Sequence, residues 1–462
     1  MDLTKIKRAY FIGLKGVGMT MLAQYLHGQG VQISGSDVAE DFSTTAETLR
    51  HIEATIFIDF KTGRQAGYDL IIYSSAYTAE KNVEVAEALA GKIKTLSYGE
   101  ALGEVFNQRY GIAVCGSHGK TTTTAWLGYV LWAAGLQPSV MVGSRVPQFS
   151  GAGLVGKSDF LVIEADEYQN KLQYFAPKAI ILNNIDFDHP DFFADEAAYN
   201  QVFVDFVGKL SAKGWLVANF DDEAVITAAE KCKGKVISYA IDHEADLRAS
   251  QLKIEQGRQY FKVSLNDEDL GDFSCQLLGK HNVSNALAVI VAGIELGVSL
   301  VDLRTQLANF TGTARRLEKA GVFNGALMFD DYAHHPTEIK ASLAALRQAY
   351  PDKKIMVVFQ AHTFSRTRAF FNDFLNSFAL ADEVLLLPVW GSAREDETTG
   401  ENLAQDLVDK MRLLNEEKNV SYLASLEDAT IYLRDNLHED EVVVLMGATD
   451  VFRIREALLK KG

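Results

Sequence analysis

Residues 112–123 of the chain have the residue types and the spacing that bind phosphate. The segment reads IAVCGSHGKTTT, in which an apolar run passes into a turn bounded by Gly116 and Gly119 and then into helical apolar spacing. In a strand–loop–helix unit of this kind, backbone N–H groups and the helix N-terminus bind phosphate oxygens. Lys120 would then reach the outer phosphates of a nucleotide, and the Thr121 hydroxyl would coordinate Mg²⁺.

The match to a phosphate loop is incomplete. The usual pattern is G-x-x-x-x-G-K-[ST], but Val114 stands where the first glycine is expected, and Gly116 lies only three residues before Gly119. A glycine-containing turn in front of an ordinary helix therefore remains an alternative for these residues taken alone.

A second glycine motif lies near the N-terminus. Residues 8–37 predict a strand, a tight turn, a helix and a second strand. The turn contains Gly13, Gly16 and Gly18, whose spacing G-x-x-G-x-G is related to the dinucleotide fingerprint. Asp37 follows at about the separation expected of a ribose-binding acid. We expect a diphosphate-bearing ligand here, either NAD(P) or a nucleotide sugar, and a plain strand–helix turn is the alternative.

Two further apolar runs end in acidic or imidazole side chains. Residues 160–163 lead into Glu164, and residues 179–182 lead into a segment that ends in His189. Because parallel strands place their carboxyl ends at one edge of a sheet, we expect these side chains to lie beside the phosphate loop. Thr121 with one or two such groups would suffice for Mg²⁺, which prefers oxygen ligands and keeps several waters.

Other polar positions near strand ends have simpler explanations. Ser74 and Ser75 follow the apolar run 70–73 and are expected to line a ligand crevice, although strand-end caps are an equal alternative. Glu167 and Asp188 are as easily explained as helix caps or solvated loop residues.

Paired amides and paired guanidinium groups follow in the second region. Asn282 and Asn285 are three residues apart on a predicted helix and share a face, from which their amides can read the edge of a base. Asn282 could instead cap that helix. Of the consecutive Arg315 and Arg316, one can point inward to phosphates.

The last region contains three apolar runs that each end in polar residues. The predicted strands are 327–332, 354–359 and 442–446. His334 follows the first strand and His362 follows the second. We expect the three polar strand ends to form one wall of a composite site.

Length and composition restrict the function. A chain of 462 residues is too long for one core, and we predict an α/β protein with three domains at residues 1–110, 111–316 and 317–462.

With 45 basic and 61 acidic residues the net charge is −16, which disfavours nucleic-acid binding. We recognise no signal peptide and no apolar run long enough for a bilayer. The three cysteines are far apart and indicate neither a zinc site nor disulfides, so a cytoplasmic location is expected.

Seven motifs resemble those of one protein family. GSHGKTTTT, EADE, NNIDFDHPD, GKHNVSNALA, the Arg315–Arg316 pair, DDYAHHPTE and FQAHTFSRTR occur in the order seen in the Mur ligases of peptidoglycan synthesis. The resemblance spans essentially the whole chain. It implies an N-terminal Rossmann-like domain that holds a UDP-sugar, a central P-loop ATPase-type domain and a C-terminal Rossmann-like domain that receives an amino acid.

The resemblance also implies roles for individual residues. The sugar-nucleotide substrate would be bound by Gly13, Gly16, Gly18, Asp37, Ser74, Ser75 and His118. ATP would be bound by Gly116, Gly119, Lys120, Thr121, Thr122, Asn282, Asn285, Arg316 and Asp331, and Mg²⁺ by Thr121, Glu164 and His189. The catalytic residues would be Lys120 and His189, together with His334, His362 and Arg366 where the amino acid docks.

The reaction implied is ATP-dependent joining of L-alanine to the carboxylate of UDP-N-acetylmuramate through an acyl phosphate. Tyr168 and Gln169 depart from the alanine-adding members, and a tyrosine there resembles recycling members that attach a whole tripeptide. Phe60, Ala361 and Thr449 also depart from the common pattern. From the residues alone, an NAD(P)-dependent oxidoreductase and an ATP-binding module that acts on a partner stay open. We expect a monomer or a homodimer.

Overall fold

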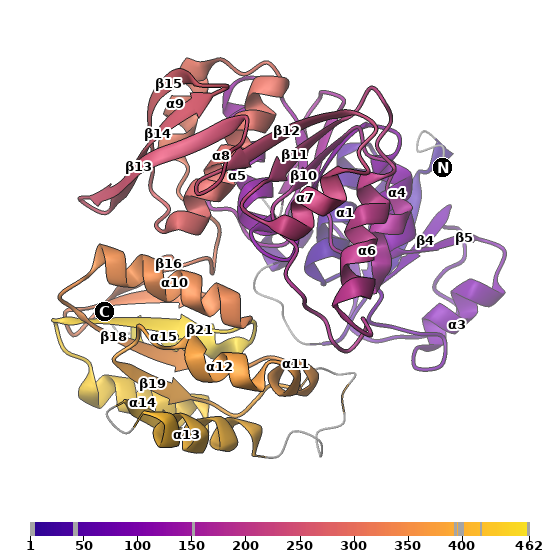
Figure 1. Cartoon of the computed structure of the whole chain (residues 1–462). Coiled ribbons are helices and arrows are strands. Elements are labelled where there is room, and N and C mark those ends of the chain that lie inside the picture. The colour runs from indigo at the N-terminus through magenta and orange to yellow at the C-terminus, as the bar shows by residue number, and fades with distance from the viewer. Residues whose placement is uncertain are drawn as a thin grey trace.

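The computed structural model describes residues 5–39, 45–149, 153–391, 395, 402–415 and 418–459. Within these residues the chain forms three sheets, one after another in sequence, each packed against helices (Figure 1). The predicted α/β class with three units is therefore confirmed. None of the helices in this described part is long and apolar enough to cross a membrane.

The first sheet is entirely parallel. Its order is β3 (Thr55–Phe57), β2 (Gln32–Ser36), β1 (Arg8–Ile12), β4 (Leu70–Tyr73) and β5 (Lys94–Ser97), with helices α1 (Val17–Gly28), α2 (Ala46–His51), α3 (Val83–Ala90) and α4 (Tyr98–Phe106). Strand order reverses between β1 and β4, which pair directly. Ligands of doubly wound sheets bind at that point. Gly13 directly follows β1, and Ser74 directly follows β4.

The second sheet places the strand that leads into the expected phosphate loop between two strands with polar ends. Strand β6 (Tyr110–Cys115) pairs in parallel with β9 (Phe160–Glu164) on one side and β10 (Ala179–Leu182) on the other. The predicted convergence of these strand ends is confirmed. The full order is β15 (Glu268–Cys275), β14 (Arg258–Leu265), β13 (Leu247–Glu255), β12 (Lys235–Ala240), β11 (Trp215–Asn219), β10, β6, β9, β7 (Ser139–Met141) and β8 (Gly153–Leu154).

Five α-helices and a 3₁₀ segment accompany the second sheet in the part of the chain described. They are α5 (Lys120–Ala133), η2 (Tyr168–Tyr174), α6 (Glu196–Val207), α7 (Glu223–Ala229), α8 (Lys280–Glu295) and α9 (Leu300–Asn309). The first two units also share an apolar core, because side chains of α4 and of η2 meet there. Phe106, for example, lies edge to face with Phe175, with ring centroids 5.2 Å apart.

The third sheet has the order β16 (Glu318–Phe323), β17 (Ala326–Asp331), β21 (Glu441–Met446), β18 (Lys354–Phe359), β19 (Glu383–Leu386) and β20 (Asn419–Tyr422). Strands β17, β21 and β18 are parallel neighbours, so the predicted wall of three polar strand ends is confirmed. The helices are α10 (Pro336–Ala349), α11 (Phe364–Ala369), α12 (Phe371–Ser377), α13 (Leu403–Leu414), α14 (Leu426–Asn436) and α15 (Arg453–Leu459), with η4 at Asp450–Phe452.

The three sheets suggest where the domains divide. The last helix of the first unit ends at Phe106, β6 begins at Tyr110, and β16 begins at Glu318. We propose the limits 1–110, 111–316 and 317–462, whose outermost residues 1 and 462 lie outside the described residues.

Helix α5 carries the phosphate loop at its N-terminus and is anchored by a buried aromatic pair. The Trp126 ring is fully buried and stacks on Phe310, with centroids 5.3 Å apart and planes inclined by 23°. Trp132, near the other end of the same helix, is 43% exposed. The packing of Trp126 therefore fixes the helix, whereas that of Trp132 contributes little.

We predict that Trp126→Ala lowers the free energy of unfolding by about 3–5 kcal/mol, because it removes a buried ring and leaves a cavity. Urea denaturation followed by circular dichroism would measure the loss. Trp132→Ala makes the same change at an exposed position and should cost far less. Equal losses in the two variants would contradict this account of how α5 is held.

Candidate active site

The loop between β6 and α5 has a backbone that requires glycine at two positions. Gly116 has φ +127° and Gly119 has φ +77°, both in the region that L side chains rarely adopt. A Cβ at Gly116 would lie 2.7 Å from the Asn184 carbonyl oxygen, and one at Gly119 would lie 2.6 Å from Asn285 Oδ1. The loop is therefore a glycine turn packed closely at the N-terminus of a 14-residue helix, as phosphate binding requires.

Lys120 is held at the centre of this loop by a buried carboxylate. Its Nζ donates to the carbonyl oxygens of Gly116 at 2.5 Å and Ser117 at 3.0 Å, and to Glu167 Oε2 at 2.9 Å. Burial opposes the charge of Lys120, but Glu167 outweighs it and raises the pKa of the amine. Glu167 is only 1% exposed, and it makes no capping hydrogen bond to η2. The solvated-loop explanation of Glu167 is therefore wrong.

Two of the three residues expected to bind Mg²⁺ touch each other. The Thr121 hydroxyl donates to Glu164 Oε1 at 2.8 Å, and the Gly143 N–H donates to Glu164 Oε2 at 2.6 Å. His189 has φ +58° and lies with its Nε2 3.6 Å from Glu167 Oε1. Potential ligand atoms of Asp166, Glu167 and His189 all lie within 4.8 Å of one another. Oxygen ligands are thus present at both Glu164 and the Asp166–Glu167–His189 cluster.

A cavity of about 730 Å³ opens beside the loop, between the central unit and α10. Such a volume is typical of small-molecule sites. Residues expected to bind a nucleotide lie in its lining, namely Gly119, Thr122, Asn282, Asn285, Arg316 and Asp331, together with His118. The structure thus brings together residues from the loop, from α8 and from the third sheet.

The two asparagines of this cavity face one another on α8. Asn285 Nδ2 donates to Asn282 Oδ1 at 3.2 Å, and Asn282 Nδ2 donates to the Leu278 carbonyl oxygen at 2.8 Å. The N-cap of α8 is Gly279, so the alternative that Asn282 caps the helix is wrong. Burial raises the pKa of Asp331 to about 6, and its carboxylate accepts a hydrogen bond from Ser342.

The consecutive arginines point in different directions. Arg316 Nη2 lies 3.3 Å from the Thr121 hydroxyl and faces the cavity. Arg315 donates instead to the carbonyl oxygens of Gly447 at 2.6 Å and Thr449 at 2.8 Å. The expectation that one arginine points inward therefore applies to Arg316, and Arg315 ties the junction to the third sheet.

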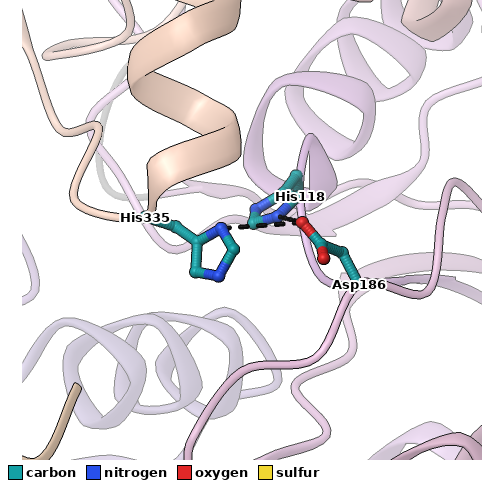
Figure 2. Close-up of side chains that lie close together, drawn as sticks. All are labelled: His118, Asp186 and His335. Carbon is teal, nitrogen blue, oxygen red and sulfur yellow. Dashed lines mark hydrogen bonds and ion pairs between the residues drawn. The ribbon is translucent and has the colours of Figure 1, made fainter. Parts of the chain in front are cut away.

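His118 connects the phosphate loop to the third unit (Figure 2). Its Nε2 lies 2.9 Å from Asp186 Oδ2, its Nδ1 lies 3.3 Å from Glu338 Oε1, and His335 Nδ1 lies 3.6 Å from the same Asp186 oxygen. Thr337 donates its hydroxyl to Asp186 at 2.6 Å. Burial would lower the pKa of His118, but the hydrogen bonds to Asp186 and Glu338 raise it to about 9. The ring is therefore an imidazolium at neutral pH.

Asp186 and Glu338 were not singled out from the sequence. Asp186 lies in the polar cluster that follows β10, and this position is the feature of the sequence that indicates a functional role for it. Glu338 forms a capping box with His335 at the start of α10. Only the packing of α10 against the loop reveals that the second carboxylate oxygen reaches His118.

The three residues expected where the amino acid docks, His334, His362 and Arg366, lie close together. Asp188 is an unexpected partner of the arginine. His334 and His362 have ring centroids 6.4 Å apart. Burial, together with the nearby charge of Arg366, lowers the pKa of His334 to about 3 and that of His362 to about 4. Arg366 is paired with Asp188, which is buried and is therefore not a solvated loop residue.

The glycine turn of the first unit is closely covered by tyrosines. Gly13 has φ +87°, and a Cβ there would lie 2.7 Å from the Tyr77 ring. A Cβ at Gly18 would lie 2.7 Å from the Tyr98 ring. Asp37 is buried, and its Oδ2 accepts from the Lys15 N–H at 2.6 Å, so it fixes the turn. Gly16, Ser74 and Ser75 are at the same edge of the sheet, after β1 and β4.

Three family models match successive parts of the chain. They are the Mur ligase family catalytic domain over residues 8–110, the Mur ligase middle domain over 114–293 and the Mur ligase glutamate ligase domain over 315–449. A protein of Desulfitobacterium hafniense named UDP-N-acetylmuramate–L-alanine ligase is 36% identical over 97% of this chain and 99% of its own. The chain belongs to the Mur ligase family.

Solved structures agree with this Mur ligase architecture. A UDP-N-acetylmuramate-alanine ligase from Thermotoga maritima has a TM-score of 0.82 at 23% identity, and 99% of each chain is covered. A murein peptide ligase from Psychrobacter arcticus has a TM-score of 0.71 at 25% identity, and 98% of each chain is covered. The three-unit fold of this Mur ligase is therefore shared over its full length.

We predict that Gly119→Ala raises the KM for ATP by about tenfold or more, because a side chain there strains the backbone and displaces the Asn285 amide. Steady-state kinetics with varied ATP would measure the change. Gly135→Ala is the matched control, because Gly135 also has positive φ (+82°) but no atom within 4 Å of an added Cβ. The same rise in both variants would contradict the predicted contact.

The raised pKa of His118 predicts a pH dependence of stability. A group whose pKa rises on folding, here from 6.5 to about 9, stabilises the fold fully below pH 6.5 and loses that effect as pH rises through about 9. The wild type should therefore lose unfolding free energy across this window relative to His118→Gln. Chemical denaturation at several pH values would test it, with exposed His243→Gln as a control that keeps the wild-type profile.

Proposed function

We propose that this protein is an ATP-dependent ligase that joins L-alanine to the carboxylate of UDP-N-acetylmuramate in peptidoglycan precursor synthesis. The main observation is that a glycine phosphate loop, a nucleotide-sized cavity and a buried arginine from the third unit meet at one interface. The family membership and the names of relatives at 34–36% identity over nearly the whole chain support this reaction.

The first step must activate a carboxylate, which is a poor electrophile. In the proposed reaction, a carboxylate oxygen of UDP-N-acetylmuramate attacks the γ-phosphorus of ATP, and ADP leaves. Phosphoryl transfer depends mainly on positioning and on neutralising charge. Lys120 and the loop N–H groups would hold the phosphates, and Arg316 would add a second positive charge from the cavity wall. All three N–H groups of Lys120 are used in the structure, so a nucleotide phosphate would replace at least one of these partners.

Mg²⁺ fits the ligand chemistry of this edge. The Thr121 hydroxyl and the Glu164 carboxylate are 2.8 Å apart and offer the hard oxygen ligands that Mg²⁺ prefers. His189, next to Glu167, could supply or support a further ligand. When bound with ATP, the metal would neutralise phosphate charge and polarise the transferred group.

In the second step the amine of L-alanine attacks the acyl carbon and phosphate leaves. The amine must be neutral, and the burial that keeps His334 and His362 uncharged allows either imidazole to accept a hydrogen bond from it. Arg366 would bind the amino-acid carboxylate. Closure of the units around the site would keep water from the acyl phosphate.

A tripeptide acceptor is the second candidate, and Tyr168 is the observation that favours it. Its ring lies 4.6 Å from that of His189, and its hydroxyl donates to Asp191 at 2.8 Å. The likeness to a murein peptide ligase at 25% identity agrees with this reading. We prefer L-alanine because the curated relatives with higher identity are named for it.

We further propose a cytoplasmic monomer or homodimer. Cys115, Cys232 and Cys275 are all free thiols, which is typical of proteins in a reducing compartment. The substrates of the proposed reaction, ATP and a nucleotide sugar, agree with that location.

The test is phosphate release with ATP, Mg²⁺ and UDP-N-acetylmuramate, comparing L-alanine, glycine, L-serine and the tripeptide as acceptors. We expect L-alanine to give the highest kcat/KM. Lys120→Met should lower kcat by about 10²–10³-fold, because it removes a charge aimed at the transferred phosphoryl group. Exposed Lys213→Met should leave the rate unchanged. No phosphate release with any acceptor would overturn the proposal.

A further inference from the structure

A buried ion pair joins the central unit to the third unit at the amino-acid end. Arg366, on α11, donates from Nε to Asp188 Oδ1 at 2.8 Å and from Nη2 to Asp188 Oδ2 at 3.2 Å. Asp188 follows β10 of the central sheet. Arg366 is 4% exposed and Asp188 is 5% exposed, so both partners of the pair are buried. A bidentate pair of this kind fixes the plane of the guanidinium group.

The guanidinium group keeps one edge available. It has five N–H groups, of which Nε–H and one on Nη2 are used by Asp188. Nη1 donates to the His362 carbonyl oxygen at 3.3 Å. One N–H on Nη1 and one on Nη2 have no partner among the residues that the structure describes. These two groups form the end of the guanidinium fork, which can bind a second carboxylate with two parallel hydrogen bonds.

The pair also connects the two ends of the proposed reaction. Asp188 directly precedes His189, which lies against Glu167 and the phosphate loop. Arg366 lies close enough to His334 and His362 to influence both imidazoles. The guanidinium group is therefore oriented by a residue next to the phosphate-binding region. We assign its remaining N–H groups to the region where the amino acid docks.

We propose that Asp188 is a positioning residue for the acceptor. It holds the Arg366 guanidinium so that the end of the fork binds the carboxylate of the incoming amino acid, and it thereby places the amine at the acyl phosphate. This inference rests on the proposed function. Asp188 itself touches neither substrate. Asp188 Oδ1 also accepts the N–H of His189 at 2.6 Å, a hydrogen bond that an amide oxygen can keep. Its effect on the acceptor passes through Arg366 and belongs to the second step.

The experiment separates the two steps in the full-length enzyme. Hydroxylamine traps an acyl phosphate as a hydroxamate without needing a carboxylate-binding group, so hydroxamate formation reports the first step. Asp188→Asn keeps the shape of the side chain but removes its charge. We expect the KM for L-alanine to rise by about tenfold or more, because a guanidinium free to turn misplaces the amine. Hydroxamate formation and the KM values for ATP and UDP-N-acetylmuramate should not change.

Two further variants make the result decisive. Exposed Asp352→Asn removes the same charge just before β18, at the opposite end of the strand that leads to Arg366, and should behave as the wild type. Arg366→Lys keeps the cross-domain charge but loses the fork, and it should show the same acceptor-specific defect. It tests the inference even if Asp188→Asn does not fold.

Two results would overturn the inference. One is an unchanged KM for L-alanine in Asp188→Asn, or in Arg366→Lys if the first variant does not fold. The other is a fall in hydroxamate formation parallel to the fall in amide formation, which would mean that the pair serves the first step or the fold as a whole. A wild type that forms neither hydroxamate nor amide would overturn the proposed function, and this inference with it.

Discussion

Negative charge gathered at one edge of the central sheet is the constraint on which the rest of the structure depends. The parallel strands β9, β6 and β10 end side by side, so five carboxylates collect around the phosphate loop. A buried carboxylate without a partner costs several kcal/mol. Each of the most buried ones has a cation: Lys120 pairs with Glu167, and Arg366 pairs with Asp188. Asp166 and Asp186 are paired with Lys171 and His118. The fifth, Glu164, is satisfied by the Thr121 hydroxyl and a backbone N–H.

This pairing explains how the third unit is held against the central unit. Arg366 comes from α11, and Glu338 at the start of α10 lies against His118 and within 3.7 Å of Arg316. The junction itself is strained, because Arg315 and Leu317 have φ values of +58° and +49°. That strain is offset by the contacts of the Arg315 guanidinium with Gly447 and Thr449. The third unit is thus held by ion pairs. The cations of these pairs can also interact with a polyphosphate and with a second carboxylate.

Much of the architecture was predictable from short patterns. Buried apolar runs such as 112–115 and 179–182 correspond to strands, and the glycine turns after β1 and β6 lie where the sequence placed them. These predictions succeeded because a parallel strand buried on both faces is a continuous apolar run, and its carboxyl end has a fixed position in the fold. The motif resemblance then led to the correct family. Side-chain partners are harder to predict, because an acid after a strand, such as Glu167 or Asp188, has the same pattern whether it is solvated or buried.

The sequence by itself determined the order of the elements, the glycines that the two loops require and the set of residues at the strand ends. It did so because periodicity and backbone restrictions act over a few neighbouring residues. Only the tertiary structure decided which charges meet. Arg366 and Asp188 are 178 residues apart, and Glu338 and His118 are 220 apart, so no local pattern links them. Their pairing follows from the way the third sheet packs over the central one, and the electrostatic cost of leaving a buried carboxylate unpaired then selects these partners.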